Sequence, residues 1–177
     1  MILVSVCFCG LANASYIDDL AAANPQLQYK AQMRQNKFGA ESMRKNLKIW
    51  RSEWVDGTAI SMRLFEWGGK KHVFMDLDYN GPKWKFYKLV TIGNGESLIE
   101  LRPVSKPVHE VISGGKVVEY LMLEPKIVDL EFMKNTKIIR AVIDFDGYST
   151  TLDFKTNIDN TMPYFEAVDH AIKFLNE

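Results

Sequence analysis

The sequence predicts an α+β domain built on a curved antiparallel β-sheet, and three observations lead to this fold class. From residue 47 onward, short runs rich in aromatic and β-branched residues alternate with glycine-containing turns, as in strands joined by hairpins. These runs follow one another too closely for the crossover helices that parallel strands require. Near the C-terminus, apolar residues recur at helical spacing, which indicates a helix packed on the sheet.

The strands and turns can be assigned in order along the chain. The expected strands cover residues 48–55, 59–67, 72–79, 83–92, 97–103, 107–113 and 116–123. The expected turns contain the dipeptides Asp56-Gly57, Gly68-Gly69, Asn80-Gly81, Asn94-Gly95 and Gly114-Gly115. Such dipeptides allow the positive φ angles of tight hairpin turns.

The last third of the chain is expected to contain a short helix, a hairpin and a terminal helix. The short helix covers residues 128–135, and Asp146-Gly147 then joins two strands. In that register Phe145 faces Tyr148 and Arg140 faces Asp153. Thr161 is expected to cap the terminal helix, with Pro163 in its first turn. Its expected buried stripe is Phe165, Val168, Ile172 and Leu175.

Residues 15–46 are expected to form a helical or partly disordered N-terminal segment ahead of the domain at residues 47–177. This segment is polar and has almost no β-branched residues, a composition that favours helix or disorder over strand. We expect a short helix after Ser15, a break at Asn24-Pro25 and a second helical segment to about Asn46.

Residues 1–14 are typical of a secretory signal peptide. An uncharged apolar run ends at Ala12-Asn13-Ala14, a small-residue pattern that signal peptidases cut. The basic start is missing, so either the true start codon lies upstream or the free amino terminus supplies the charge. The alternative is a buried N-terminal strand. The sequence therefore predicts a periplasmic or secreted protein, cleaved near Ala14-Ser15.

Both cysteines, Cys7 and Cys9, lie inside this signal, so the mature chain has neither disulfide nor thiolate metal site. Its hydrophobic core must therefore stabilise the fold without covalent support, which a chain of this length allows. We expect one such domain, with no transmembrane segment in the mature chain.

Basic residues concentrate in one stretch although the chain as a whole has no net charge. The stretch contains Lys30, Arg34, Lys37, Arg44, Lys45, Lys48 and Arg51. The simpler interpretation is a solvated helix face, and the functional one is contact with anionic lipid or glycan. No nucleic-acid-binding motif occurs, so we expect no nucleic-acid partner.

A resemblance can be stated from the order of motifs along the chain. Trp84-Lys85-Phe86 follows a hairpin, and Gly114-Gly115 precedes a strand that is followed by a short helix. The Asp146-Gly147 hairpin then precedes the terminal helix. This order resembles that of small exported bacterial domains of uncharacterised function. The resemblance implies export and fold, and it implies no catalytic residues.

The one acidic motif is Asp76-Leu77-Asp78-Tyr79-Asn80-Gly81, which matches the first half of a calcium loop. Asp76, Asp78 and Asn80 are thus candidate metal ligands. However, the twelfth position, where a bidentate acid belongs, is Tyr87, and the flanks are strand-like. The alternative is a hairpin whose acids face water. No cofactor is predicted, with calcium as the one option.

Aromatic residues supply the other candidate site. Trp50 and Trp54 are expected on one face of the first strand, and Trp84 shares a face with Phe86. These residues belong either to the core or to an exposed surface that binds sugar or protein. We therefore expect a non-enzymatic binding or accessory module of the cell envelope, with an envelope protein or a glycan as partner. The alternatives are an inhibitor or immunity-like protein of an exported enzyme, and a hydrolase using acids around Asp76 and Asp78.

Overall fold

The computed structural model describes residues 15–35, 37, 39–93, 97–134, 140–145, 148–153 and 160–177. Within them the fold is α+β, as the sequence predicts, with a strongly curled antiparallel sheet and a C-terminal helix. The described helices are α1 (Tyr16–Ala23), α2 (Ile127–Lys134) and α3 (Tyr164–Asn176).

The ten described strands form two separate antiparallel sheets. The six-stranded sheet has the order β1-β2-β3-β4-β8-β7, and the four-stranded sheet has the order β10-β9-β5-β6. The larger sheet consists of β1 (Gln28–Gln35), β2 (Glu41–Arg51), β3 (Thr58–Trp67), β4 (Lys70–Gly81), β8 (Val117–Leu123) and β7 (Val108–Val111). The smaller consists of β10 (Tyr148–Asp153), β9 (Arg140–Phe145), β5 (Leu89–Gly93) and β6 (Leu98–Leu101).

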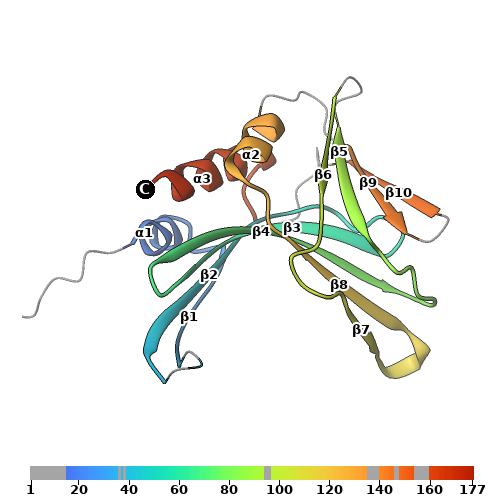
Figure 1. The fold of residues 1–177 in the computed structure, drawn as a ribbon, viewed down its shortest axis with the longest axis horizontal. Helices are drawn as coiled ribbons and strands as arrows, with labels where there is room; N and C mark the ends of the chain where they lie inside the picture. Colours follow the sequence, from blue (N-terminus) through green and yellow to red (C-terminus); the bar gives the residue numbers. More distant parts are fainter. Residues whose placement is uncertain are drawn as a thin grey trace, which may run out of the picture.

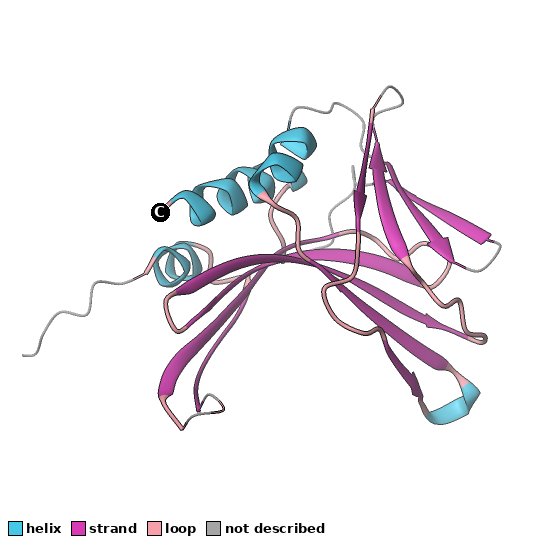
Figure 2. Ribbon diagram, in the orientation of Figure 1, coloured by secondary structure: helices cyan, strands magenta, loops and turns pink. Residues whose placement is uncertain are grey.

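The six-stranded sheet is arched, and the three described α-helices lie on its convex side, whereas a 3-10 helix (Ser113–Gly115) forms the tip of the β7–β8 hairpin. Figure 1 shows α1, α2 and α3 above the left part of the sheet and the four-stranded sheet above its right part. The core lies between these layers, where Ile60, Met62 and Leu64 of β3 are fully buried against the underside of the helices. Figure 2 shows that, in the described part of the chain, no helix or strand covers the opposite, concave face.

The second helical segment predicted for residues 26–46 is wrong, because this region forms the β1–β2 hairpin. The helix predicted after Ser15 is confirmed as α1. Helix propensity is a weak preference, and strand pairing outweighs it in this segment. β2 pairs with β3 from Arg44 to Arg51, so the backbone groups of β2 form hydrogen bonds with a buried strand. The hairpin continues through residue 46 without a break.

One predicted turn is also wrong. Asn80-Gly81 lies within β4, because β4 keeps pairing with β8 as far as Gly81 opposite Val117. A loop at residues 82–88 follows, so β5 begins only at Leu89. The predicted positive φ angles at Asp56-Gly57, Gly68-Gly69 and Gly114-Gly115 are confirmed. Asn94-Gly95 and Asp146-Gly147 lie outside the described residues.

The predicted register of the last hairpin is confirmed, since Phe145 pairs with Tyr148 and Arg140 with Asp153. The terminal helix begins later than expected, with Pro163 rather than Thr161 at the N-cap position. Its buried face is also rotated: Phe165 is exposed, and the buried residues are Tyr164, Ala167, Val168, Ala171 and Phe174. Small alanines allow α3 to approach the sheet closely, which the larger predicted side chains would prevent.

Helix α1 is tied to the β1–β2 hairpin through one carboxylate. Asp18 accepts hydrogen bonds from the Lys45 ammonium at 2.5 Å, from the Tyr29 hydroxyl and from Ser15 at the start of the helix. Burial raises the pKa of Asp18, but these hydrogen bonds outweigh it and lower the pKa to about 2. The ionised form of Asp18 therefore fastens α1 to the sheet.

We expect Asp18→Asn to remove a stabilisation that depends on pH. The unfolded carboxyl titrates near 3.8 and the folded one near 2, so the stabilisation is complete above pH 3.8 and is lost as the pH falls through about 2. Urea unfolding of wild type and variant should differ near neutral pH and converge near pH 2. Asp19→Asn, which alters an exposed neighbour, is the control. A difference that stays constant with pH would contradict this role.

Candidate functional site

The concave face of the six-stranded sheet carries a group of polar side chains with no described helix or strand over it. Side chains alternate between the two faces of a strand, so the residues between the core positions of β2, β3 and β4 all point to this face. A hollow of about 280 Å³ opens there. It is lined by Gln28, Lys30, Arg44, Asn46, Lys48, Arg63, Asp76 and Tyr120.

Register places these residues in rows across neighbouring strands. Gln28 of β1, Lys48 of β2 and Arg63 of β3 form one row. Lys30 and Asn46 belong to the next row. Neighbouring strands lie about 4.8 Å apart, and diagonal neighbours about 7–8 Å, so the cationic groups reach a common space.

A buried ion pair forms one wall of the hollow. The Arg63 guanidinium donates to both oxygens of Asp76, with Nε 2.5 Å from Oδ2 and Nη2 3.2 Å from Oδ1. The Tyr120 hydroxyl also donates to Asp76 Oδ1 at 2.5 Å. Burial lowers the pKa of Arg63, but the Asp76 carboxylate outweighs it and the net shift is upward. Arg63 is therefore a fixed, fully charged and already neutralised part of the site.

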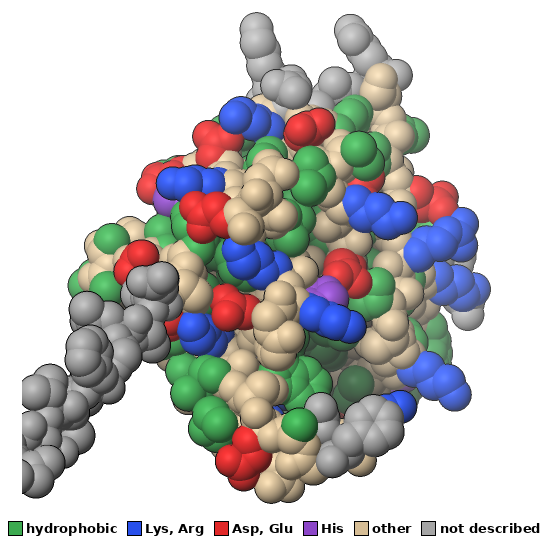
Figure 3. All heavy atoms as spheres, turned by 60° about the vertical axis from the view of Figure 1, so that its left-hand side comes forward, with side chains coloured by type: hydrophobic (Ala, Val, Ile, Leu, Met, Phe, Trp, Pro, Cys, Tyr) green, Lys and Arg blue, Asp and Glu red, His purple; other side chains and the backbone are tan. Residues whose placement is uncertain are grey.

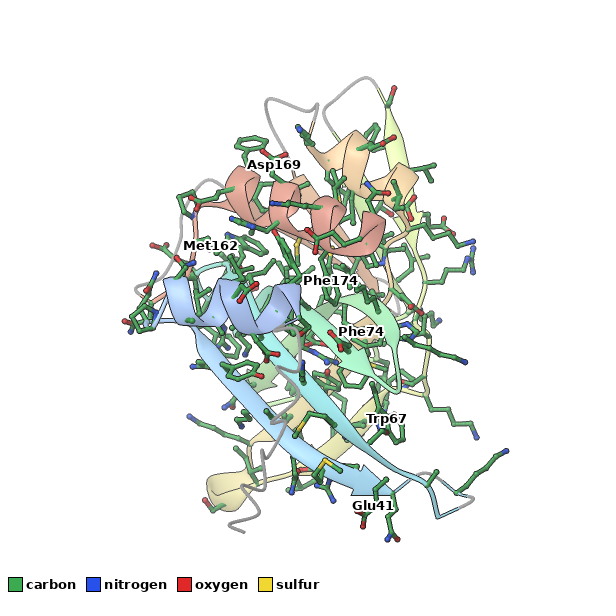
Figure 4. The ribbon with its side chains drawn as sticks, turned by 90° about the vertical axis from the view of Figure 1, so that its left-hand side faces the viewer. Glu41, Trp67, Phe74, Met162, Asp169 and Phe174 are labelled. Carbon is green, nitrogen blue, oxygen red and sulfur yellow. The ribbon has the colours of Figure 1, made fainter. Side chains whose placement is uncertain are left out.

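Aromatic rings form cation–π contacts with two guanidinium groups of the hollow. Arg63 lies over Phe74 at 4.6 Å from the ring centroid, and Arg44 lies over Phe65 at 5.1 Å. Such cation–π contacts hold a cation without neutralising it. Figure 4 shows Phe174 under α3, whereas Phe74 and Trp67 lie further along the sheet. The aromatic layer thus positions Arg44 while leaving its charge unpaired.

Three cations of the hollow have no carboxylate partner among the described residues. Lys30 and Lys48 form neither a hydrogen bond nor an ion pair there, and Arg44 has only its contact with Phe65. Burial lowers the pKa of Lys48, and the nearby carboxylates of Asp78 and Asp76 only partly oppose this effect. A half-buried ammonium without a partner is costly, and such costs concentrate at functional sites.

Some cations of the protein do have carboxylate partners. On the side turned forward in Figure 3, basic and acidic side chains are interspersed. Lys45 of the basic stretch pairs with Asp18 at 2.5 Å, and Lys134 pairs with Asp169 at 2.7 Å. Lys45 and Lys134 thus have carboxylate partners, which Lys30, Arg44 and Lys48 lack among the described residues.

Beside the hollow, the same face holds a second polar group. Arg51 lies 3.6 Å from Asp78 and stacks on Trp54 at 4.7 Å. Burial raises the pKa of Asp78, with Arg51 and Lys48 opposing the shift. The Ser61 hydroxyl and the Arg51 Nε are buried without a hydrogen-bond partner among the described residues. Buried polar atoms of this kind are uncommon in folded proteins.

The predicted metal ligands lie close together, but in an arrangement that does not resemble a calcium loop. Asp76, Asp78 and Asn80 occupy alternate positions of strand β4 rather than a loop. Asp76 is held by Arg63 and Asp78 by Arg51, so cations already occupy the carboxylates. Among the described residues, no group of three or more His, Cys, Asp or Glu side chains is placed to hold a metal ion.

The predicted aromatic surface is separated into three places. Trp50 is fully buried in the core because a bulge between Lys48 and Trp50 turns it inward. Trp54 lies beyond the end of β2 and is 48% exposed. Trp84 packs with Phe86, on the loop at residues 82–88, and with His109 of β7. Trp50 and Trp54 therefore do not share a face, whereas Trp84 and Phe86 do contact each other.

The sequence pointed to part of the hollow but not to its architecture. The basic stretch singled out Lys30, Arg44 and Lys48, but as a helix face and not as paired strands beside Arg63. Arg63 and Tyr120 were missed. A sequence pattern could have identified them, because Arg63 in β3 and Tyr120 in β8 are polar residues that alternate with apolar neighbours within largely buried strands.

Comparisons with known proteins give no assignment. No protein-family model matches the chain, and neither the curated proteins nor the solved structures contain a significant match. Among the described helices, none has the length and apolar character needed to cross a membrane.

The buried pair makes a clear prediction about stability. Arg63→Met should destabilise the protein by about 3 kcal/mol, because it leaves the Asp76 carboxylate buried and without its cation. The double variant Arg63→Met/Asp76→Leu should recover most of this loss. Chemical denaturation of wild type, both single variants and the double variant measures the coupling. A loss in the double variant equal to the sum of the two single-variant losses would show that the pair is not coupled.

Proposed function

We propose that this protein is an exported, non-enzymatic binding module whose concave face takes up a small anionic ligand. The observation that carries the proposal is the convergence of Lys30, Arg44 and Lys48 on one hollow without a carboxylate partner among the described residues. An anion would supply the missing partner, and charge-assisted hydrogen bonds to it are stronger than neutral ones.

The size and lining of the hollow favour a small polar ligand. Its volume of about 280 Å³ lies at the lower end of the range for small-molecule sites. Neutral amides of Gln28 and Asn46 and the Tyr120 hydroxyl stand beside the cations. This mixture suits a carboxylate or phosphate that also carries hydroxyl groups, such as an acidic sugar.

Binding is better supported than hydrolysis by Asp76 and Asp78. A general base must reach a proton with a free oxygen. Both Asp76 oxygens already accept hydrogen bonds from Arg63, and Oδ1 accepts another from Tyr120. Asp78 lies against Arg51. In the proposed role Asp76 positions Arg63, and the ligand is bound without being cleaved.

Export is part of the proposal, supported by the apolar run and the small-residue site before Ser15. In a bacterial host, a C-terminally tagged chain should be recovered from the periplasmic fraction with Ser15 as its first residue. Mass spectrometry of the N-terminal peptide reads this directly. A cytosolic protein that retains residues 1–14 would refute export while leaving the binding site intact.

Lys48→Met should stabilise the fold and weaken binding at the same time. The change removes a half-buried unpaired charge, so we expect the free energy of unfolding to rise by about 0.5–1 kcal/mol. Isothermal titration with D-glucuronate and with inorganic phosphate should show about tenfold weaker binding, because one charged hydrogen bond is lost. Lys126→Met, at an exposed position, is the control.

Two results would contradict the binding proposal. Wild-type protein that binds neither D-glucuronate nor phosphate more tightly than neutral D-glucose would remove the preference for anions. A Lys48→Met variant that binds like wild type would show that the ligand does not use the hollow.

A further inference from the structure

Three side chains at one end of β2 form a group beside the hollow without lining it. The Arg51 guanidinium lies 3.6 Å from the Asp78 carboxylate of β4. The same guanidinium stacks on the Trp54 ring, at 4.7 Å from its centroid. One cation therefore joins an aromatic ring to a carboxylate. We call Arg51, Trp54 and Asp78 the tryptophan group.

Strand register makes the tryptophan group continuous with the hollow. Asp78 pairs directly with Tyr120 of β8, which lines the hollow. Arg51 pairs with Ser61 of β3, and Ser61 pairs with Asp76, which also lines the hollow. Directly opposite residues of antiparallel strands have Cβ atoms about 4.5–5.5 Å apart. A ligand that fills the hollow therefore has the tryptophan group next to it.

Asp78 retains a hydrogen-bonding capacity that Asp76 has already used. Asp76 accepts hydrogen bonds from Arg63 and Tyr120, whereas Asp78 accepts none from a described residue. Its 3.6 Å contact with Arg51 is longer than a hydrogen bond. The Asp78 side chain is 28% exposed, so a ligand can reach it. A carboxylate has about four acceptor positions, which suit the hydroxyl groups of a ligand.

Trp54 adds an apolar surface to these polar groups. Its side chain is 48% exposed although the Arg51 guanidinium lies over the ring. An indole ring packs well against a ligand that has an apolar face and a polar edge. A sugar ring has this character, since its faces carry C–H groups and its edge carries hydroxyl groups. Trp54 can thus contact the face of a sugar ring while Arg51 and Asp78 bind its hydroxyl groups.

The charges of the tryptophan group favour a neutral ring. Arg51 and Asp78 have opposite charges and lie close together, whereas Lys30, Arg44 and Lys48 leave the hollow with unpaired positive charge. An anionic ring at the tryptophan group would bring its charge close to Asp78, and like charges repel. Hydroxyl groups both donate and accept, so they match the guanidinium and the carboxylate at the same time.

We propose that the tryptophan group is a second subsite, which binds a neutral sugar ring joined to the acidic sugar held in the hollow. This inference rests on the proposed function and narrows its ligand class to oligosaccharides that contain an acidic and a neutral sugar. When two linked rings occupy adjoining subsites, the second contact forms within the complex, so the affinity exceeds that of either ring alone.

The test is isothermal titration of the protein with D-glucuronate and with the tetrasaccharide of hyaluronan, in which glucuronate alternates with neutral N-acetylglucosamine. Wild type should bind the tetrasaccharide about tenfold more tightly than D-glucuronate. Trp54→Ala should remove this gain and leave the affinity for D-glucuronate unchanged. Trp54→Phe, which keeps an aromatic ring, should retain most of the gain. Phe165→Ala is the matched control, because it removes an equally exposed ring from α3 on the other side of the sheet.

The outcomes separate the second subsite from the hollow, with thermal melting to confirm that each variant is folded. Equal affinity of wild type for the two ligands would overturn the second subsite while leaving the hollow as an anion site. Equal effects of Trp54→Ala and Phe165→Ala on tetrasaccharide binding would also overturn it. Loss of D-glucuronate binding in Trp54→Ala would contradict the division into two subsites. Wild type that binds neither ligand would refute the proposed function itself.

Discussion

The structure depends on a sheet whose two faces are buried in different ways: helices and the smaller sheet pack on one face, whereas Ser61, Arg63 and Asp76 are buried on the other with no described helix or strand over them. The helices and the smaller sheet cover the convex side of the six-stranded sheet, so every second residue of β2, β3, β4 and β8 must point to the uncovered concave side. Polar residues at those positions would be costly unless they were paired, and Arg63, Asp76 and Tyr120 solve this by binding one another. Because these three side chains bind one another, the charges of Arg63 and Asp76 are tolerated in the buried centre of the sheet.

The same constraint explains why the remaining cations are informative. Around the network, Lys48 is half-buried with a lowered pKa and has given up part of its hydration, whereas Arg44 lies exposed over Phe65. A protein that only needed a stable sheet would gain by replacing Lys48 with an apolar residue. The cost is consistent with selection for an anion at that place. In the loop at residues 82–88, the buried Glu119 carboxylate accepts a hydrogen bond from the backbone N–H of Phe86, whose ring is exposed.

Much of the fold follows from local patterns in the sequence, and the failures have physical causes. The β3–β4 hairpin, the register of the last hairpin and helix α2 were predicted because turn glycines and alternation act over a few residues. The β1–β2 hairpin was missed because its residues favour helix, while its strand form depends on distant pairing with β3. The hollow could not be predicted for the same reason. Lys30, Lys48 and Arg63 come together only through that pairing. Trp50 lies in the core because of a bulge in β2 that no local sequence pattern predicts.

The most direct test of the central claim is a two-dimensional NMR titration of the ¹⁵N-labelled chain beginning at Ser15 with D-glucuronate. If the concave face binds anions, the amide signals of Lys30, Arg44, Asn46 and Lys48 should shift together along one saturating curve, and those of α2 and α3 should stay in place. Neutral D-glucose should leave all of them unmoved. Shifts that are absent, that never saturate, or that are confined to residues outside the hollow would contradict the claim that this face is the binding site.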